Sequence, residues 1–243
     1  MSKAPLRVNL WSGPRNISTA MMYSFAQRSD TTVFDEPLYA HYLSKTPAKT
    51  YHPGADEVLN AQENNGTKVV EMMMGGHPTP VVFFKQMTHH LVALEWDFML
   101  DCTNIILTRD PKDMLLSFIN QIEEPQIEDT GYAAHHELLI FLKKHKLPLI
   151  VLDSKNVLLN PEKVLKKLCD SIGISFEKTM LSWKAGSRKE DGVWAKYWYQ
   201  NVHKSSGFSK YQSKKENLPD HLVPLYKACL PYYNELKKLA IQP

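Results

Sequence analysis

The chain has 243 residues, 43% hydrophobic and 23% charged, which suits one large globular domain over residues 1–243 and excludes a disordered chain. A formal net charge of +3 is too small for a general nucleic-acid-binding surface, so we expect no nucleic-acid partner. The three cysteines follow no disulfide or zinc spacing, and no apolar run suits a signal peptide or membrane span. We therefore expect a cytoplasmic protein with no metal and no membrane partner.

Short apolar runs alternate with helical patterns along most of the chain. We expect strands over residues 6–11, 31–34, 81–85, 104–108 and 149–153. We expect helices over residues 18–28, 55–64, 67–74, 91–100, 111–120, 132–145, 161–172 and 219–239. Nearly continuous apolar strands separated by helices are typical of a parallel sheet that is covered on both faces. The sequence therefore predicts an α/β fold with a central parallel sheet of about five strands flanked by helices, and ligands at the carboxyl ends of the strands.

Two segments depart from this alternation. Residues 123–129 carry four acidic side chains and a proline, so we expect an exposed loop there. Residues 185–216 are polar and basic, with interspersed aromatic side chains and no regular period. This second segment is either a surface loop that its aromatic side chains hold against the domain, or a loop that closes over a ligand.

The first predicted strand ends in a tight turn that carries one arginine and then leads into a helix. Such a turn points backbone N–H groups and a helix N-terminus at an anion. The version that binds nucleoside triphosphates ends in Gly-Lys-Ser or Gly-Lys-Thr, and that ending is missing. The candidate anion-binding residues are Ser12, Gly13, Arg15, Asn16, Ser18 and Thr19.

A second charged turn follows the strand predicted at residues 104–108. Arg109 leaves the end of that strand, Pro111 suits the first turn of a helix, and Ser117 lies two turns into it. Because both turns follow strand ends, we expect them on one edge of the sheet.

Together, the two turns resemble the two phosphosulfate-binding motifs of the sulfotransferases, which have a P-loop-like fold. In that family the first loop holds the 5′-phosphosulfate of the donor PAPS, and PAP is the product. The second supplies an arginine and a serine to the 3′-phosphate, a role that the resemblance gives to Arg109 and Ser117. The resemblance also implies Arg188 and Lys189 in the loop near the 3′-phosphate, where Glu190 replaces a glycine of cytosolic members.

Sulfuryl transfer requires cations at the oxygen that leaves and a base for the acceptor hydroxyl. Arg15 and Lys85 are our candidates for charge stabilisation, Lys85 because it ends an apolar strand. Glu36 is our preferred base, since it follows a strand end and Glu36-Pro37 resembles carbohydrate sulfotransferases. His89 and His90 are the rival bases.

The resemblance thus implies a sulfotransferase that moves a sulfuryl group from PAPS to a hydroxyl, or an amine, of a small molecule or carbohydrate. A P-loop phosphotransferase (kinase) is one alternative, and magnesium dependence would distinguish it. A non-catalytic PAP-binding protein of the same fold is the other, because Ile17 and Glu190 depart from the family pattern.

Overall fold

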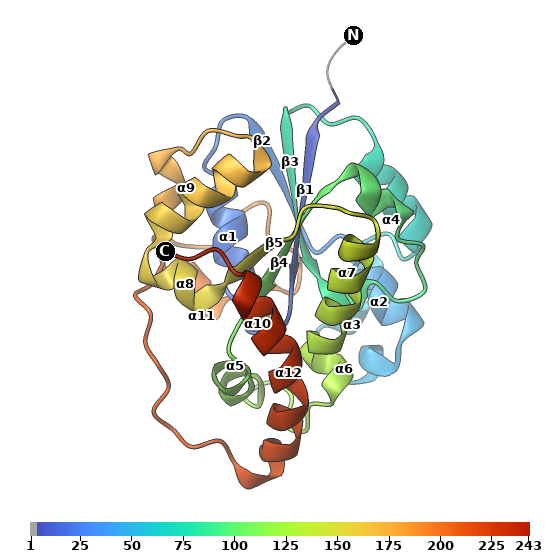
Figure 1. Cartoon of the computed structure of the whole chain (residues 1–243). Helices are drawn as coiled ribbons and strands as arrows, with labels where there is room; N and C mark the ends of the chain where they lie inside the picture. Colours follow the sequence, from blue (N-terminus) through green and yellow to red (C-terminus); the bar gives the residue numbers. More distant parts are fainter. Residues whose placement is uncertain (1–3) are drawn as a thin grey trace.

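Five parallel strands form one sheet in the order β2-β3-β1-β4-β5, with helices on both of its faces (Figure 1). The computed structural model describes residues 4–243. The strands are β1 (Leu6–Ser12), β2 (Thr31–Asp35), β3 (Val81–Met87), β4 (Thr103–Thr108) and β5 (Ile150–Asp153). The α-helices are α1 (Ser18–Phe25), α2 (Tyr39–Lys45), α3 (Ala55–Ala61), α4 (Gly66–Met74), α5 (Pro111–Phe118), α6 (Ile127–Thr130), α7 (Tyr132–Lys144), α8 (Ser154–Leu159), α9 (Pro161–Ile172), α10 (Ala195–Trp198), α11 (Gln200–His203) and α12 (Val223–Leu239). Short 3-10 helices are η1 (Pro47–Thr50), η2 (Thr88–His90), η3 (Asp97–Asp101), η4 (Lys178–Leu181) and η5 (Asp220–Leu222).

The central strand is β1, which pairs in parallel with both β3 and β4. Strands β2 and β5 complete the sheet at its two edges. Because all the strands run in one direction, their carboxyl ends meet at one edge of the sheet, where α/β proteins bind ligands. The predicted fold class is confirmed.

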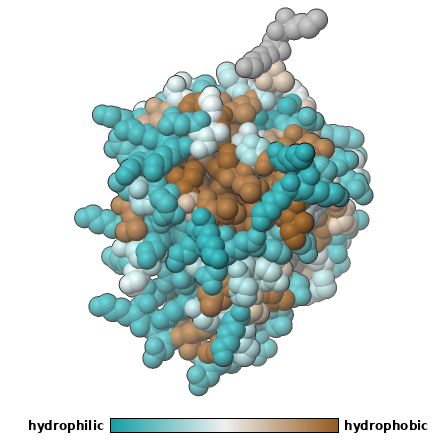
Figure 2. Space-filling view, viewed as in Figure 1, coloured by the Kyte–Doolittle hydropathy of each residue, from teal (hydrophilic) through white to brown (hydrophobic). Residues whose placement is uncertain are grey.

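Helices bury the sheet from both sides, which explains why its strands are apolar on both faces. On one face α1, α8 and α9 pack against the sheet, and Phe25 of α1 stacks on Phe83 of β3 with ring centroids 4.2 Å apart. On the other face α4, α7 and α12 contribute Met73, Leu138 and Leu236 to a second buried cluster. Figure 2 shows that apolar side chains also gather in the middle of the visible surface, with hydrophilic side chains around them.

Two expectations about local structure were wrong. The helix expected over residues 91–100 is reduced to η3, because Ala93 adopts a left-handed backbone with φ of 50° that no right-handed helix can pass through. The loop expected over residues 123–129 ends in α6. There the side chains of Gln126 and Asp129 cap the helix reciprocally, and Asp129 is buried rather than exposed.

The C-terminal segment returns to the sheet, since Ala240 forms a parallel bridge with Val151 of β5.

Across residues 4–243, the structure has no helix that combines the length and the apolar surface needed to cross a membrane.

Candidate functional site

A cavity of about 620 Å³ lies at the carboxyl edge of the sheet. It brings together most of the predicted site residues: Gly13, Arg15, Asn16, Ser18, Thr19, Glu36, Lys85, His89, His90, Arg109 and Ser117. They come from the ends of β1, β2, β3 and β4 and from the helices that follow, as the parallel sheet requires.

The turn after β1 is held closely against the junction of α6 and α7. A Cβ atom on Gly13 would lie 2.9 Å from the backbone oxygen of Thr130, so this approach requires glycine. On the other side, Asn16 Nδ2 donates a hydrogen bond of 3.1 Å to the backbone oxygen of Leu107 in β4. Arg15 adopts φ of 52°, a left-handed conformation that costs a non-glycine residue energy and is concentrated at functional sites.

Two arginines and a serine join the two turns. Arg15 Nε donates a hydrogen bond of 3.0 Å to Ser117 Oγ, and the guanidinium of Arg109 donates to the backbone oxygen of Arg15. Burial lowers the pKa of both guanidinium groups, and the charge of Arg109 lowers the pKa of Arg15 further. Two partly buried cations that repel each other favour an anion that neutralises both.

Helix α1 begins directly after the first turn. Ile17 occupies its N-cap position, with no side-chain hydrogen bond there, and Ser18 and Thr19 begin its first turn. All three residues line the cavity. The first N–H groups of a helix have no intrahelical partner, so this end of α1 favours an anion beside the arginines.

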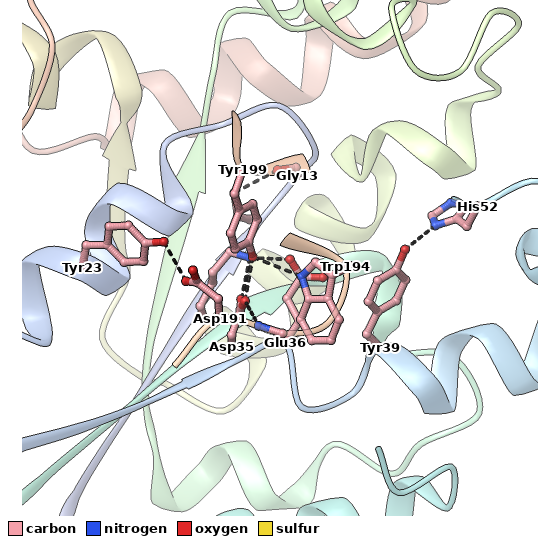
Figure 3. Close-up of polar contacts among 12 residues, drawn as sticks. Gly13, Tyr23, Asp35, Glu36, Tyr39, His52, Asp191, Trp194 and Tyr199 are labelled. Carbon is pink, nitrogen blue, oxygen red and sulfur yellow. Dashed lines mark hydrogen bonds and ion pairs between the residues drawn. The ribbon is translucent and has the colours of Figure 1, made fainter. Parts of the chain in front are cut away.

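A buried lysine on β3 is held by two carboxylates at the end of β2. Lys85 Nζ donates hydrogen bonds to Asp35 Oδ1 at 2.8 Å, to Glu36 Oε1, and to Tyr199 Oη at 2.6 Å. Tyr199 donates to Asp35 at 2.8 Å and accepts a bond of 3.1 Å from Trp194 Nε1, and Figure 3 shows these side chains converging. Lys85 is only 1% exposed, so the carboxylates compensate its charge inside the protein.

Of the two carboxylates, Glu36 lines the cavity. Its backbone is left-handed, with φ of 42°, so it is the second strained non-glycine residue at this edge. Burial raises the pKa of Glu36 above its usual range; the charge of Lys85 opposes this shift, and the charge of Asp35 adds to it. A carboxyl group with a raised pKa accepts a proton more readily, as a general base requires.

Aromatic and imidazole rings wall another part of the cavity. The ring of His90 stacks between those of Tyr39 and Tyr42, at centroid distances of 4.9 and 4.7 Å. Tyr39 Oη is hydrogen-bonded to His52 Nδ1 at 2.8 Å (Figure 3). Burial lowers the pKa of His52 to about 4 and of His89 to about 3, and it lowers the pKa of His90 in the same direction. These imidazoles are therefore uncharged at neutral pH.

Three of the residues predicted to bind the donor do not line the cavity. Ser12 is fully buried beneath the turn, where its Oγ donates to the backbone oxygen of Gly13. Arg188 lies over the ring of Tyr23, with its Cζ 5.1 Å from the centroid, and pairs with Glu190 at 3.4 Å. Lys189 lines a separate groove beside β2. Glu190, the departure from the family pattern, is thus the ion-pair partner of Arg188.

Sequence reasoning missed a fourth cationic side chain of the cavity, besides Arg15, Lys85 and Arg109. Lys214 lies on the extended segment between α11 and α12 (Figure 1) and lines the cavity. Burial lowers its pKa, and the charge of Arg109 lowers it further. It also missed Asp35 and Tyr199 as partners of Lys85. Only the adjacency of Asp35 to Glu36 offered a signal.

A comparison of the sequence with protein families decides which family the chain belongs to. The family model described as a sulfotransferase domain matches residues 6–240, nearly the whole chain. The chain belongs to the sulfotransferase family. Its fold is also similar to three solved structures, at TM-scores that indicate a shared architecture. They are the sulfotransferase domain of the Synechococcus PCC 7002 olefin synthase (TM-score 0.59, 13% identity, 93% of this chain and 95% of that chain), the sulfotransferase domain of the curacin biosynthetic pathway (0.58, 16%, 100% of both) and a sulfotransferase from Alicyclobacillus acidocaldarius (0.54, 11%, 100% and 98%).

Two curated relatives of this sulfotransferase-family chain come from Arabidopsis thaliana. They are the branched-chain-amino-acid aminotransferase-like proteins 2 and 1, which are 37% identical over 232 residues and 38% identical over 235 residues. The match covers 95% and 96% of this chain but 41% and 42% of the relatives, so the chain spans about two fifths of their length.

Proposed function

We propose that this protein transfers a sulfuryl group from PAPS to a hydroxyl, or less favourably an amine, of a small molecule or carbohydrate. The observation that carries the proposal is the pair of partly buried arginines, Arg15 and Arg109: Arg109 donates to the backbone oxygen of Arg15, and Arg15 donates to Ser117. They line the same cavity as Lys85 and Glu36. A bisphosphorylated donor supplies the two anionic groups that such a pair favours.

The donor end of the cavity has a part for each phosphate. Arg15 and the start of α1, with Ser18 and Thr19, suit the 5′-phosphosulfate, because the helix end and the guanidinium act on the same anion. Arg109 and Ser117 suit the 3′-phosphate, as the family resemblance implies. Lys214, which lines the same cavity, is our candidate for the further cation there, in place of Arg188 and Lys189.

In the proposed reaction, the acceptor oxygen attacks the sulfur atom and forms a new S–O bond. The bond between sulfur and the bridging 5′-phosphate oxygen breaks, and its electron pair stays on that oxygen of PAP. The guanidinium of Arg15 and the ammonium of Lys85 stabilise the negative charge that grows there. Because both cations are already fixed by neighbouring groups, they need little reorganisation.

The hydroxyl proton of the acceptor passes to the carboxylate of Glu36. Glu36 lines the cavity together with Arg15 and Lys85, and its pKa is raised by burial. Its contact with Lys85 places the base beside a charge-stabilising cation, so proton removal and charge stabilisation occur within one hydrogen-bonded cluster. The lowered pKa of His89 and His90 makes these imidazoles weaker bases than an unperturbed histidine.

The test compares two isomers of one nucleotide. PAP, the 3′,5′-bisphosphate, at about a hundredfold over its Kd should stabilise the protein by roughly 2.7 kcal/mol. The 2′,5′-bisphosphate has the same charge but a displaced phosphate, and it should stabilise far less, as should AMP. Equal thermal shifts with the two isomers would contradict the proposed donor site. Loss of nucleotide binding in EDTA would favour a phosphotransferase, and PAP binding without any consumption of PAPS would favour a non-catalytic protein.

A further inference from the structure

The charges of the proposed active cavity are separated. Its cationic side chains Arg15, Arg109 and Lys214 lie near one another, since the charge of Arg109 acts on both of the others. The remaining lysine, Lys85, is compensated by its two carboxylate partners. Positive charge is therefore concentrated where the proposed function puts the donor phosphates.

The cavity also has uncharged rings and, besides Glu36, one further carboxylate in its lining. Tyr39, His52, His90 and Trp198 line it, with burial holding the imidazoles neutral. Nδ1 of His90 is buried without a hydrogen-bond partner among the described residues, although the ring lies in the cavity wall. The electron-rich faces of tyrosine and tryptophan rings attract cations, including quaternary ammonium groups.

The carboxylate is Asp129, which joins this cavity to a smaller one of about 340 Å³. The charged residues lining the smaller cavity are all acidic, namely Glu123, Glu124 and Asp129. Asp129 accepts hydrogen bonds from Tyr51 Oη at 2.9 Å and from the backbone N–H of Gln126 at 2.8 Å, which leaves lone pairs on both carboxylate oxygens. Tyr51 itself is 47% exposed at the smaller cavity, so a further ring lies beside the carboxylates.

We infer that the acceptor is cationic: an amino alcohol whose ammonium group is held by Asp129 and the surrounding rings while its hydroxyl faces Glu36. This inference rests on the proposed function and specifies its substrate class. The acidic side chains of the smaller cavity attract cations and repel anionic acceptors over the range of a Debye length, about 8 Å at physiological salt. The bonds formed and broken are those of the reaction proposed above: the hydroxyl proton passes to Glu36, and the sulfated amino alcohol leaves as a zwitterion.

The experiment uses three small alcohols on the full chain saturated with PAP. Choline carries a quaternary ammonium, 3,3-dimethylbutan-1-ol is its neutral isostere, and 3-hydroxypropanoate is anionic. Calorimetry should give choline a Kd about tenfold or more below that of the neutral isostere, with no binding of the anion. Raising the salt concentration should weaken the binding of choline alone. Choline that fails to bind, or that binds no better than its isostere, overturns the inference.

Substitutions test whether the acidic residues cause the preference for choline over its neutral isostere. Asp129→Asn should remove about tenfold of the affinity for choline and leave that for the neutral isostere unchanged. Glu123→Gln with Glu124→Gln, at exposed positions, should lower choline affinity by a smaller factor. Glu128→Gln, on α6 but outside the lining of both cavities, is the matched control and should change nothing. PAP binding is measured separately. If PAP does not bind, the proposed function fails, whereas intact PAP binding without a preference for choline overturns only this inference.

Discussion

The guanidinium of Arg15 donates a hydrogen bond to the hydroxyl of Ser117, 3.0 Å away in space and 102 positions away in the sequence. Arg15 lies in the charged turn that follows β1, and Ser117 lies in α5, the helix that begins after the charged turn following β4. Because the backbone oxygen of Arg15 also accepts from Arg109, the two turns form one unit. A change in either turn therefore affects the geometry of both.

The two arginines should differ in their kinetic effects. Arg109→Ala should mainly raise the KM for PAPS, because a phosphate that does not react contributes uniform binding. Arg15→Ala should also lower kcat, because charge near the transferred group grows in the transition state. Steady-state kinetics with varied PAPS measures both effects, and Lys112→Ala on α5 provides a control outside the cavity lining. An Arg15→Ala enzyme with unchanged kcat would contradict the role of this residue.

Glu36→Gln should keep donor affinity and lower turnover by about 10²–10⁴, the usual contribution of a positioned base. The amide retains the shape of the side chain but cannot take the acceptor proton. His89→Ala and His90→Ala should each cost much less. Acceptor turnover, or the slow hydrolysis of PAPS, gives the rates, and calorimetry with PAP gives the donor affinity. A larger loss in either histidine variant transfers the role of the base to that histidine.

Tyr199→Phe should destabilise the protein by about 1–3 kcal/mol, because it removes the hydroxyl that bonds Lys85, Asp35 and Trp194 in a buried network. Tyr197→Phe is the matched control: its hydroxyl bonds Glu57 at the surface, at 2.8 Å, and should contribute less than about 1 kcal/mol. Urea unfolding of both variants measures the difference. Equal losses would mean that the buried network adds no stability.

Gly13→Ala should distort the turn, because its new methyl group meets the backbone oxygen of Thr130 at 2.9 Å. We expect a loss of about 1–3 kcal/mol in the free energy of unfolding, together with weaker PAP binding. Gly76→Ala adds the same methyl group where no atom lies within 4 Å, so it should be nearly neutral. Thermal unfolding with and without PAP compares them. A Gly13→Ala protein as stable as the Gly76→Ala protein would refute the close approach.

Acid should destabilise the fold through its buried histidines. Burial lowers the pKa of His135 to about 4 and of His89 to about 3, so the unfolded chain binds protons first as the pH falls below about 6.5. Stability is then lost between pH 6.5 and 4, by up to about 1.4 kcal/mol per pH unit for each histidine. His135→Leu removes one such group, so unfolding free energies at pH 7 and pH 5 should differ less in this variant. An unchanged pH dependence would contradict the assignment.

The fold was largely predictable because its strands are buried on both faces, which makes each strand a continuous apolar run. Local backbone conformations could not be predicted in the same way. The composition around Ala93 does not indicate its left-handed conformation. The reciprocal cap between Gln126 and Asp129 lies within an acidic stretch that is typical of a loop. Our expectation that the turns bearing Arg15 and Arg109 share one edge of the sheet depended only on topology, whereas the role of Ser117 came from the family resemblance. The separation of Arg188 from that edge depends on its packing with Tyr23 and Glu190, which no strand pattern encodes.

The bond between Tyr199 and Asp35 joins residues 164 positions apart, and it completes the environment of Lys85. A nascent chain can pair its first strands long before Tyr199 is synthesised, but it then buries a lysine and two carboxylates with one partner missing. Contacts of such long sequence separation form late because closing the loop is entropically costly. We therefore expect the proposed active cavity to be completed near the end of folding, after the sheet that supports it.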